Sequence, residues 1–207
     1  MNNQTVIGNE RGGATVMVIS LIVMIFCILV MVVGIDYILL YTKQSKVKND
    51  LNAAVHAASL SIDEAELSKG FFRLDTTTAN TRAQDMFYKY LRLNMKLGTT
   101  NKALPGSPIA QGTQVNIEEL IYVDYESRTI TNLNTLPTGC ILNTSLVQVS
   151  CNVTLNGGSP TEITQVINQS IAGPSVVAII SATFKGIGNL NEEPLLLPAV
   201  QEVYFRK

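Results

Sequence analysis

The 207-residue sequence is poor in the residues from which catalytic and metal sites are built. It has no tryptophan, a single histidine (His56) and three cysteines. A histidine-rich metal site and a four-cysteine zinc site are therefore excluded within one chain. A Ser–His–Asp or Cys–His mechanism would have to use His56, which lies in an alanine-rich stretch. Because phosphate-loop, zinc and Gly-x-Ser-x-Gly motifs are also missing, we expect no enzyme activity, cofactor or small-molecule substrate.

Charged residues are scarce as well, at 15% of the chain, against about 25% in an average soluble protein. The 15 basic and 16 acidic residues give a net charge of −1. Nucleic-acid-binding proteins usually carry a basic excess, so this balance argues against a nucleic-acid partner. Hydrophobic residues make up 46% of the chain, which is too many for a disordered protein.

One long apolar run without charge, Ala14 to Ile35, stands near the N-terminus. As a helix its 22 residues span about 33 Å, enough to cross a bilayer. It exceeds the apolar core of about 7–15 residues in a cleaved signal peptide, so we expect an uncleaved signal anchor. Asp36, Tyr37 and Tyr41 follow at the expected membrane edge. Two interpretations stay open: Asp36 contacts a neighbouring subunit or assembly platform, or it is solvated beside interfacial tyrosines.

The helix is predicted to continue beyond the membrane edge as a stalk. No proline or glycine occurs from Ile35 to Lys69, and one helix from about Ala14 to about Leu60 would be roughly 70 Å long. A helical apolar stripe runs along this stalk. Its members are Leu51, Ala54, Val55 and Ala58. This stripe needs a surface to pack against, which is either the chain's own domain or a neighbouring subunit.

The rest of the chain predicts a small α+β domain. A polar loop with three acids spans Asp63 to Lys69, and a second, amphipathic helix runs from about Thr77 to Leu97 and ends at Gly98. Its aromatic residues Phe87 and Tyr90 are interpreted as core. The acids of the loop are Asp63, Glu64 and Glu66, and they lack the pattern of a calcium loop.

Four strands are predicted after this helix, and they form a small antiparallel sheet. Their ranges are Val115–Tyr125, Val147–Leu155, Val176–Phe184 and Ala199–Phe205. The third is nearly all apolar, which predicts a central strand that is buried on both faces. The expected layout is pilin-like, with the second helix and the stalk docked on the sheet. The expected organisation is a tail at 1–13, the transmembrane and stalk helix at 14–62, and an exported domain at 63–207.

Cys140 and Cys151 flank a short extended stretch of ten residues. In an oxidising compartment they would form a disulfide that closes a hairpin. The alternative is a pair of free thiols, with Cys151 filling the core. Cys27 lies in the apolar run and is interpreted as an inert apolar residue.

About a quarter of the chain, at its N-terminal end, resembles the TadE/TadG-like proteins of bacterial tight-adherence (Tad/Flp) pilus systems. The resemblance rests on Arg11-Gly12 before the apolar run, Gly34-Ile35-Asp36 at its end, then Tyr41, Lys43 and the alanine-rich segment Leu51–Ala58. Cleavage after Gly12 or Gly13 would place Met17 or Val18 where type IV prepilins carry glutamate. This departure favours an anchor that is not cleaved.

The resemblance implies a cytoplasmic N-terminus and a domain outside the cytoplasm of a single-pass membrane protein. Lysine counting alone, on Lys43, Lys46 and Lys48, would favour the opposite orientation, but the family shares these basic residues. The implied partners are the membrane and other pilus-assembly or pilin-like subunits, possibly further copies of this chain. The implied role is that of a minor pilin, a pseudopilin or a membrane scaffold. The alternative is a membrane-tethered binding or sensory domain with no filament role.

Overall fold

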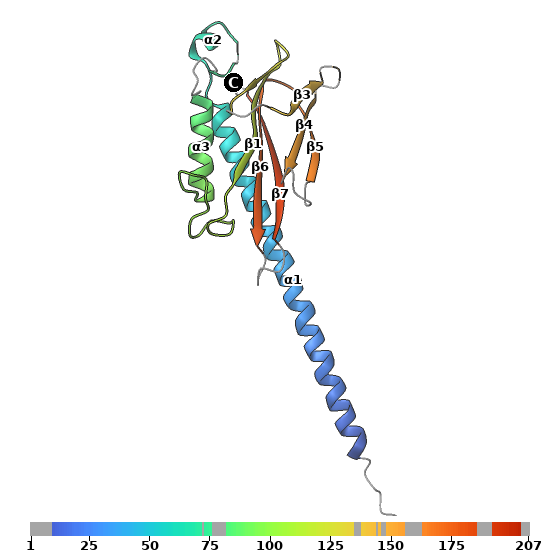
Figure 1. Ribbon diagram of the computed structural model, residues 1–207. Coiled ribbons are helices and arrows are strands. Elements are labelled where there is room, and N and C mark those ends of the chain that lie inside the picture. The colour runs from blue at the N-terminus through green and yellow to red at the C-terminus, as the bar shows by residue number, and fades with distance from the viewer. Residues whose placement is uncertain are drawn as a thin grey trace, which may run out of the picture.

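The computed structural model describes residues 10–71, 73–75, 82–134, 138–143, 145, 148–155, 163–185 and 192–203. Its helices are α1 (Glu10–Ser59), α2 (Glu64–Ser68) and α3 (Arg82–Met95). Its strands are β1 (Asn116–Asp124), β2 (Thr129–Asn132), β3 (Cys140–Asn143), β4 (Gln148–Leu155), β5 (Ile163–Ser170), β6 (Ser175–Lys185) and β7 (Glu192–Glu202). Figure 1 shows one long helix that carries a mixed α and β domain at its C-terminal end.

The helix α1 is continuous over 50 residues, which confirms the predicted passage from apolar run to stalk without a break. Glycine or proline would interrupt such a helix, and only Gly34 lies in its central part. The N-terminal half of α1 projects away from the domain, whereas its C-terminal half lies within it (Figure 1). The stalk is thus a part of the domain's core.

The strands form two antiparallel sheets where one was predicted. The larger has the order β2-β1-β6-β7, and the smaller has the order β3-β4-β5. α1 and α3 cover one face of the larger sheet, and the smaller sheet packs on its other face, so the domain has three layers. The single predicted sheet was wrong because the short strands β2 and β3 and the polar strand β5 carry weak sequence signals.

Strand β6 is central and buried on both faces, as predicted. It pairs with β1 on one side and with β7 on the other. Val176, Ala178 and Ile180 face the helices, whereas Val177 and Ile179 face the smaller sheet, and all five are fully buried. An apolar residue at every position is needed because a layer of protein covers each face.

Strand β7 begins at Glu192, seven residues before the predicted start at Ala199. Pro194 and Pro198 argue against a strand in this part of the sequence, because proline is rare inside a sheet. Both prolines are tolerated because β7 lies at the edge of its sheet. The outer side of an edge strand forms no hydrogen bonds to another strand, so a missing N–H on that side costs none. The predicted end at Phe205 and the predicted start of the second strand at Val147 lie outside the described residues.

Two helix predictions also need correction. The acidic loop contains the short helix α2, whose N-terminus is capped by Asp63 through a bond of 2.8 Å to the Ala65 amide. Helix α3 ends at Met95 before the predicted stop at Gly98, because Lys96 adopts a left-handed φ of 51°. Tyr90, predicted to be core, is 36% exposed. The predicted start at Thr77 lies outside the described residues.

Candidate membrane anchor and assembly surfaces

The projecting half of α1 exposes apolar side chains in all directions. From Val16 to Leu39 every large apolar side chain is between 40% and 71% exposed. Isolated exposed apolar residues are normal on a soluble protein, but an uninterrupted surface of this length requires a lipid or protein environment. Among the described residues, α1 is the one helix that is long and apolar enough to cross a membrane. This helix fits a single-pass membrane anchor.

The junction between anchor and domain is abrupt. Ile35 is still exposed, whereas Leu40 already packs against the domain core and Val47 is fully buried. From Ile35 to Leu40 the helix rises only about 7.5 Å. The end of the domain at which α1 leaves therefore stands directly at the end of the apolar run, without a flexible linker.

Asp36, Tyr37 and Tyr41 lie at this junction. Tyr37 and Tyr41 are 68% and 74% exposed, and their spacing of four residues places them on one face of α1. This exposure is what an interfacial aromatic belt requires. Asp36 is partly exposed at the same level. Both interpretations of Asp36, solvation and contact with another subunit, remain predictions.

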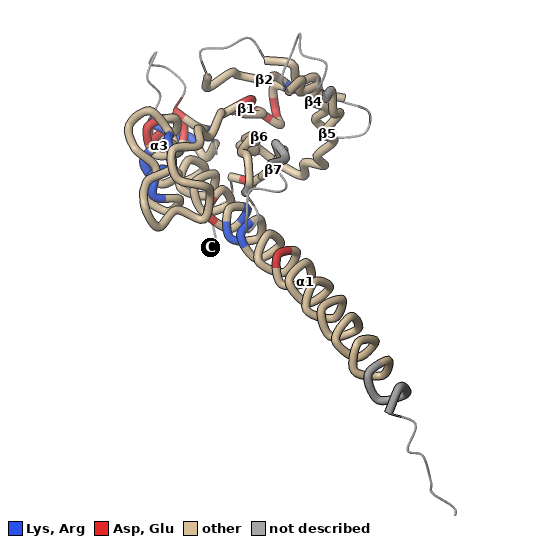
Figure 2. The backbone as a smooth tube through the Cα atoms, turned by 60° about the horizontal axis from the view of Figure 1, so that its bottom comes forward, with Lys and Arg blue, Asp and Glu red and all other residues tan. Residues whose placement is uncertain are grey.

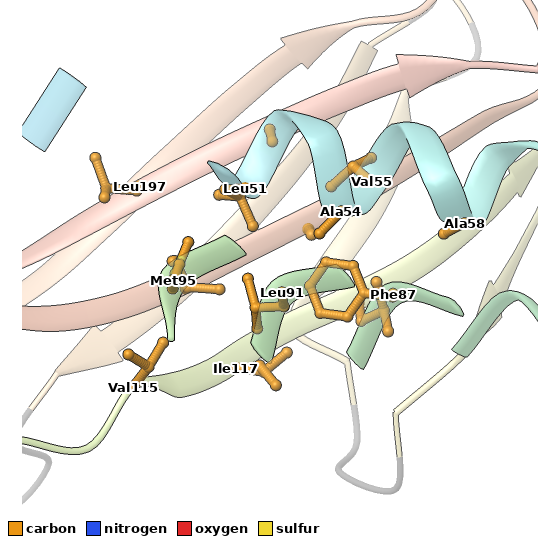
Figure 3. Close-up of a cluster of buried hydrophobic side chains, with 14 of the residues drawn as sticks. Leu51, Ala54, Val55, Ala58, Phe87, Leu91, Met95, Val115, Ile117 and Leu197 are labelled. Atoms are coloured by element: carbon orange, nitrogen blue, oxygen red, sulfur yellow. The ribbon is translucent and has the colours of Figure 1, made fainter. Parts of the chain in front are cut away.

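The stalk stripe of Leu51, Ala54, Val55 and Ala58 packs within the chain. All four side chains are fully buried. Figure 3 shows them facing Phe87, Leu91 and Met95 of α3, with the two helices antiparallel, and Leu197 of β7 belongs to the same buried cluster. Small alanine side chains at two of the four positions allow α1 and α3 to approach closely. Of the two surfaces expected for this stripe, the structure shows packing on the chain's own domain.

The two predicted cysteine partners face each other on adjacent strands. Cys140 of β3 is paired in register with Cys151 of β4, and a disulfide with an S–S distance of 2.02 Å joins them. Both residues are buried in the cluster between the two sheets. The bond therefore fixes the β3–β4 hairpin from the inside of the domain. Cys27 is an exposed free thiol on the anchor.

A buried carboxylate that the sequence analysis missed joins the two sheets. Glu119 of β1 is only 5% exposed. Its two oxygens accept hydrogen bonds from the Gly139 amide at 2.7 Å and from the Thr138 hydroxyl at 2.8 Å. A side chain at Gly139 would stand 2.6 Å from the carbonyl oxygen of Asn152. The available signal was the position of this glutamate directly before the apolar run Leu120–Val123 of a predicted strand, because a carboxylate buried there requires a polar partner.

A second charged cluster surrounds Arg73 near α2, at the end of the domain opposite the anchor (Figure 1). The guanidinium lies 3.3 Å from Asp124, 3.5 Å from Glu126 and 4.0 Å from Glu66. Burial, with the charge of Asp124 as a smaller contribution, raises the pKa of nearby Tyr122 to about 12. These pairs fasten α2 and its following segment to the end of β1.

The acidic and histidine candidates do not come together. Asp63 caps α2, Glu64 is exposed, and Glu66 pairs with Lys69 at 2.6 Å. His56 is exposed on α1. Within the described part of the chain, no group of three or more metal-ligating side chains converges.

No protein-family model, curated protein or solved structure is found to match this chain.

Proposed function

We propose that this chain is a single-pass, membrane-anchored structural or assembly protein of the Tad/Flp type, with a pilin-like layout. The observation that carries the proposal is the division of α1 into an apolar half that projects freely and a half that forms the domain core. A rigid helix of this kind fixes a folded domain at a membrane or in a helical bundle. All the residues that carry the resemblance to the TadE/TadG-like anchor lie on this helix.

We place the domain outside the cytoplasm. The disulfide between Cys140 and Cys151 supports this orientation, since such bonds persist in oxidising compartments. The test is protease treatment of intact cells, stripped of any wall, that produce the chain with an epitope after Lys207. Digestion of the epitope is expected. Its protection until the cells are lysed would place the domain in the cytoplasm and overturn the orientation.

Assembly is tested on the anchor, because the stalk stripe is already occupied. The native thiol of Cys27 is exposed there. In a Cys27→Ser background, single cysteines are placed in turn at consecutive positions from Val23 to Val33 and oxidised in the native membrane. A subunit of a helical bundle should cross-link to copies or partners at positions spaced by three or four residues. Absence of cross-links at every position would contradict a packed anchor.

A membrane-tethered binding or sensory domain is the second candidate. The observation in its favour is the intramolecular burial of Leu51, Ala54, Val55 and Ala58, which gives the single chain a complete core. A tethered monomer predicts no periodic cross-linking along the anchor, whereas a minor pilin, pseudopilin or scaffold predicts it. The same cysteine series therefore separates the two functions.

A further inference from the structure

The end of the domain nearest to the anchor is basic on its α3 side. Because α3 runs antiparallel to α1, its C-terminus and the following segment return to the end at which α1 leaves the domain (Figures 1 and 3). From Lys96 to Asn116 the sequence has two lysines and no acid, and from Tyr37 to Asn49 it has three lysines and no acid. Figure 2 shows basic residues of α1 where the helix joins the domain.

We define the basal surface as Lys43, Lys46 and Lys48 of α1 with Lys96, Lys102 and Leu104 of the segment after α3. The side chains of Lys46, Lys48, Lys96 and Lys102 are exposed, and Leu104 is 47% exposed. At the same end, β7 begins with Glu192 and Glu193. The parts of this end that are basic in sequence are the junction segment of α1 and the segment after α3.

The segment after α3 is held firmly against the helix end. The Leu104 amide donates to the Lys96 carbonyl at 3.0 Å, and the Gly98 amide donates to the Lys102 carbonyl at 2.8 Å. A side chain at Gly106 would lie 3.1 Å from Lys96 Nζ, so the ammonium group stands over the turn that follows Leu104. Two cations and one exposed leucine are thus presented together on a defined backbone.

The distance to the membrane follows from α1. Leu40 is packed on the domain only four residues after Asp36, a rise of about 6 Å. Along the continuous helix, Lys43, Lys46 and Lys48 lie about 10, 15 and 18 Å beyond Asp36. Lys43 therefore stands at about one Debye length, roughly 10 Å, from the level at which the apolar run ends. Each lysine near an anionic membrane surface shifts the binding equilibrium toward the membrane about fivefold.

We propose that the basal surface binds the headgroups of anionic lipids in the membrane that holds α1, with Leu104 entering the interface, so that the domain rests on the bilayer. This inference rests on the proposed membrane anchorage. The occupant is a lipid surface because the basic residues continue directly from the anchor and their charge is complementary to that of anionic lipids. An acidic protein partner is the competing occupant.

The test uses the full chain in nanodiscs of phosphatidylcholine, with or without about one third phosphatidylglycerol. In a Cys27→Ser background, Leu104→Cys carries a fluorophore and the lipids carry a headgroup quencher. Glu64→Cys, whose parent side chain is 90% exposed on α2 at the far end of the domain, is the control position. Quenching at position 104 that requires phosphatidylglycerol and weakens with added salt is expected, with none at position 64.

Charge variants separate lipid binding from simple proximity. The double variant Lys96→Gln with Lys102→Gln should lower the ratio of docked to undocked domain about 25-fold in anionic discs, from two lysines at about fivefold each. The matched control is the double variant Lys69→Gln with Arg82→Gln, which removes two cations at the far end of the domain. It should leave the ratio of docked to undocked domain unchanged.

Equal quenching at position 104 with and without phosphatidylglycerol, or none in either disc, would overturn lipid binding while the anchor stands. An equal effect of the basal and distal charge pairs would also overturn it. If the chain did not enter the discs at all, the failure would be that of the proposed anchorage.

Discussion

Replacing Ala54 by glutamate tests directly whether the stalk stripe belongs to the domain core. Ala54 is fully buried between α1 and α3, whereas its neighbour Ala53 is exposed. The two residues have the same chemistry and the same helical backbone. Ala54→Glu and Ala53→Glu therefore form a matched pair that differs only in the direction of the new side chain.

The expected cost is large at one position and small at the other. At Ala54 the added atoms overpack a site that already holds Phe87 and Leu91, at about 1–3 kcal/mol. An unpaired buried carboxylate costs a further ~3–5 kcal/mol. The sum approaches the total stability of about 5–15 kcal/mol that a domain of this kind has. At Ala53 the change should stay within about 0.5 kcal/mol.

The assay is pulse proteolysis of the full chain across a urea series in one detergent. The surviving domain is detected through an epitope that it carries. Ala54→Glu should be digested with little or no urea, whereas Ala53→Glu should keep the midpoint of the unchanged chain. Val55→Ala is a milder variant that should still fold. It removes two buried methyl groups and should lower the unfolding free energy by about 2 kcal/mol.

Equal midpoints for Ala54→Glu and Ala53→Glu would refute intramolecular burial of the stripe. Loss of co-purifying partners with an unchanged urea midpoint would assign the stripe to an intermolecular interface instead. Either result would favour the assembly interpretation of Leu51, Ala54, Val55 and Ala58 that the structure argues against.

Three further predictions concern the buried polar and covalent links of the domain. Glu119→Gln should lower the unfolding free energy by about 2–3 kcal/mol, since an amide cannot accept both hydrogen bonds that the carboxylate accepts; an unchanged urea midpoint would contradict the inter-sheet role. Replacing Cys140 and Cys151 together by alanine should lower the unfolding free energy by about 2–3 kcal/mol. If the unchanged chain migrates identically on reducing and non-reducing gels, the disulfide does not form. Burial raises the pKa of Asp50 above its ordinary 3.8, against the opposing effect of Lys46. The folded chain then binds the proton more tightly than the unfolded chain, so stability falls as pH rises from 3.8 through the raised value; Asp50→Asn should flatten that slope, and an identical slope in both chains would refute it.

The parts of the fold that could be predicted are those with strong periodicity. The helix α1 was predictable because apolar residues run consecutively through the anchor and then recur at helical spacing from Leu51 to Ala58. Strand β6 was predictable because an uninterrupted apolar run of strand length needs cover on both faces. In each case local sequence and tertiary environment require the same pattern.

The remaining parts depend on contacts that no local pattern reveals. β5 is largely polar along its length and is a strand because it pairs with β4. β7 contains two prolines that only an edge position tolerates. On α3, the buried stripe of Ala83, Phe87 and Leu91 is narrow, so that Tyr90 falls outside it although its spacing from Phe87 is helical.

The candidate surfaces divide in the same way. The anchor and the cysteine pair followed from composition and spacing, whereas Glu119 and the basal surface followed from the assembled fold. The basal surface depends on α3 running back toward the junction, so that the segment after α3 lies at the end of the domain at which α1 leaves (Figures 1 and 3). Residues more than fifty positions apart share that end only because of the antiparallel packing of α1 and α3.

The position of an assembly interface follows from what the domain has already buried. The stripe of the stalk is used within the chain, and the exposed large apolar residues of the described domain are distributed over separate elements, as with Leu93 on α3, Ile141 on β3 and Val166 on β5. The anchor, by contrast, exposes an uninterrupted apolar surface. Because it continues into the domain core without a linker, any partner that packs against the anchor also fixes the orientation of the domain. Substitutions on the anchor should therefore separate assembly from folding, whereas substitutions on the stalk should affect folding first.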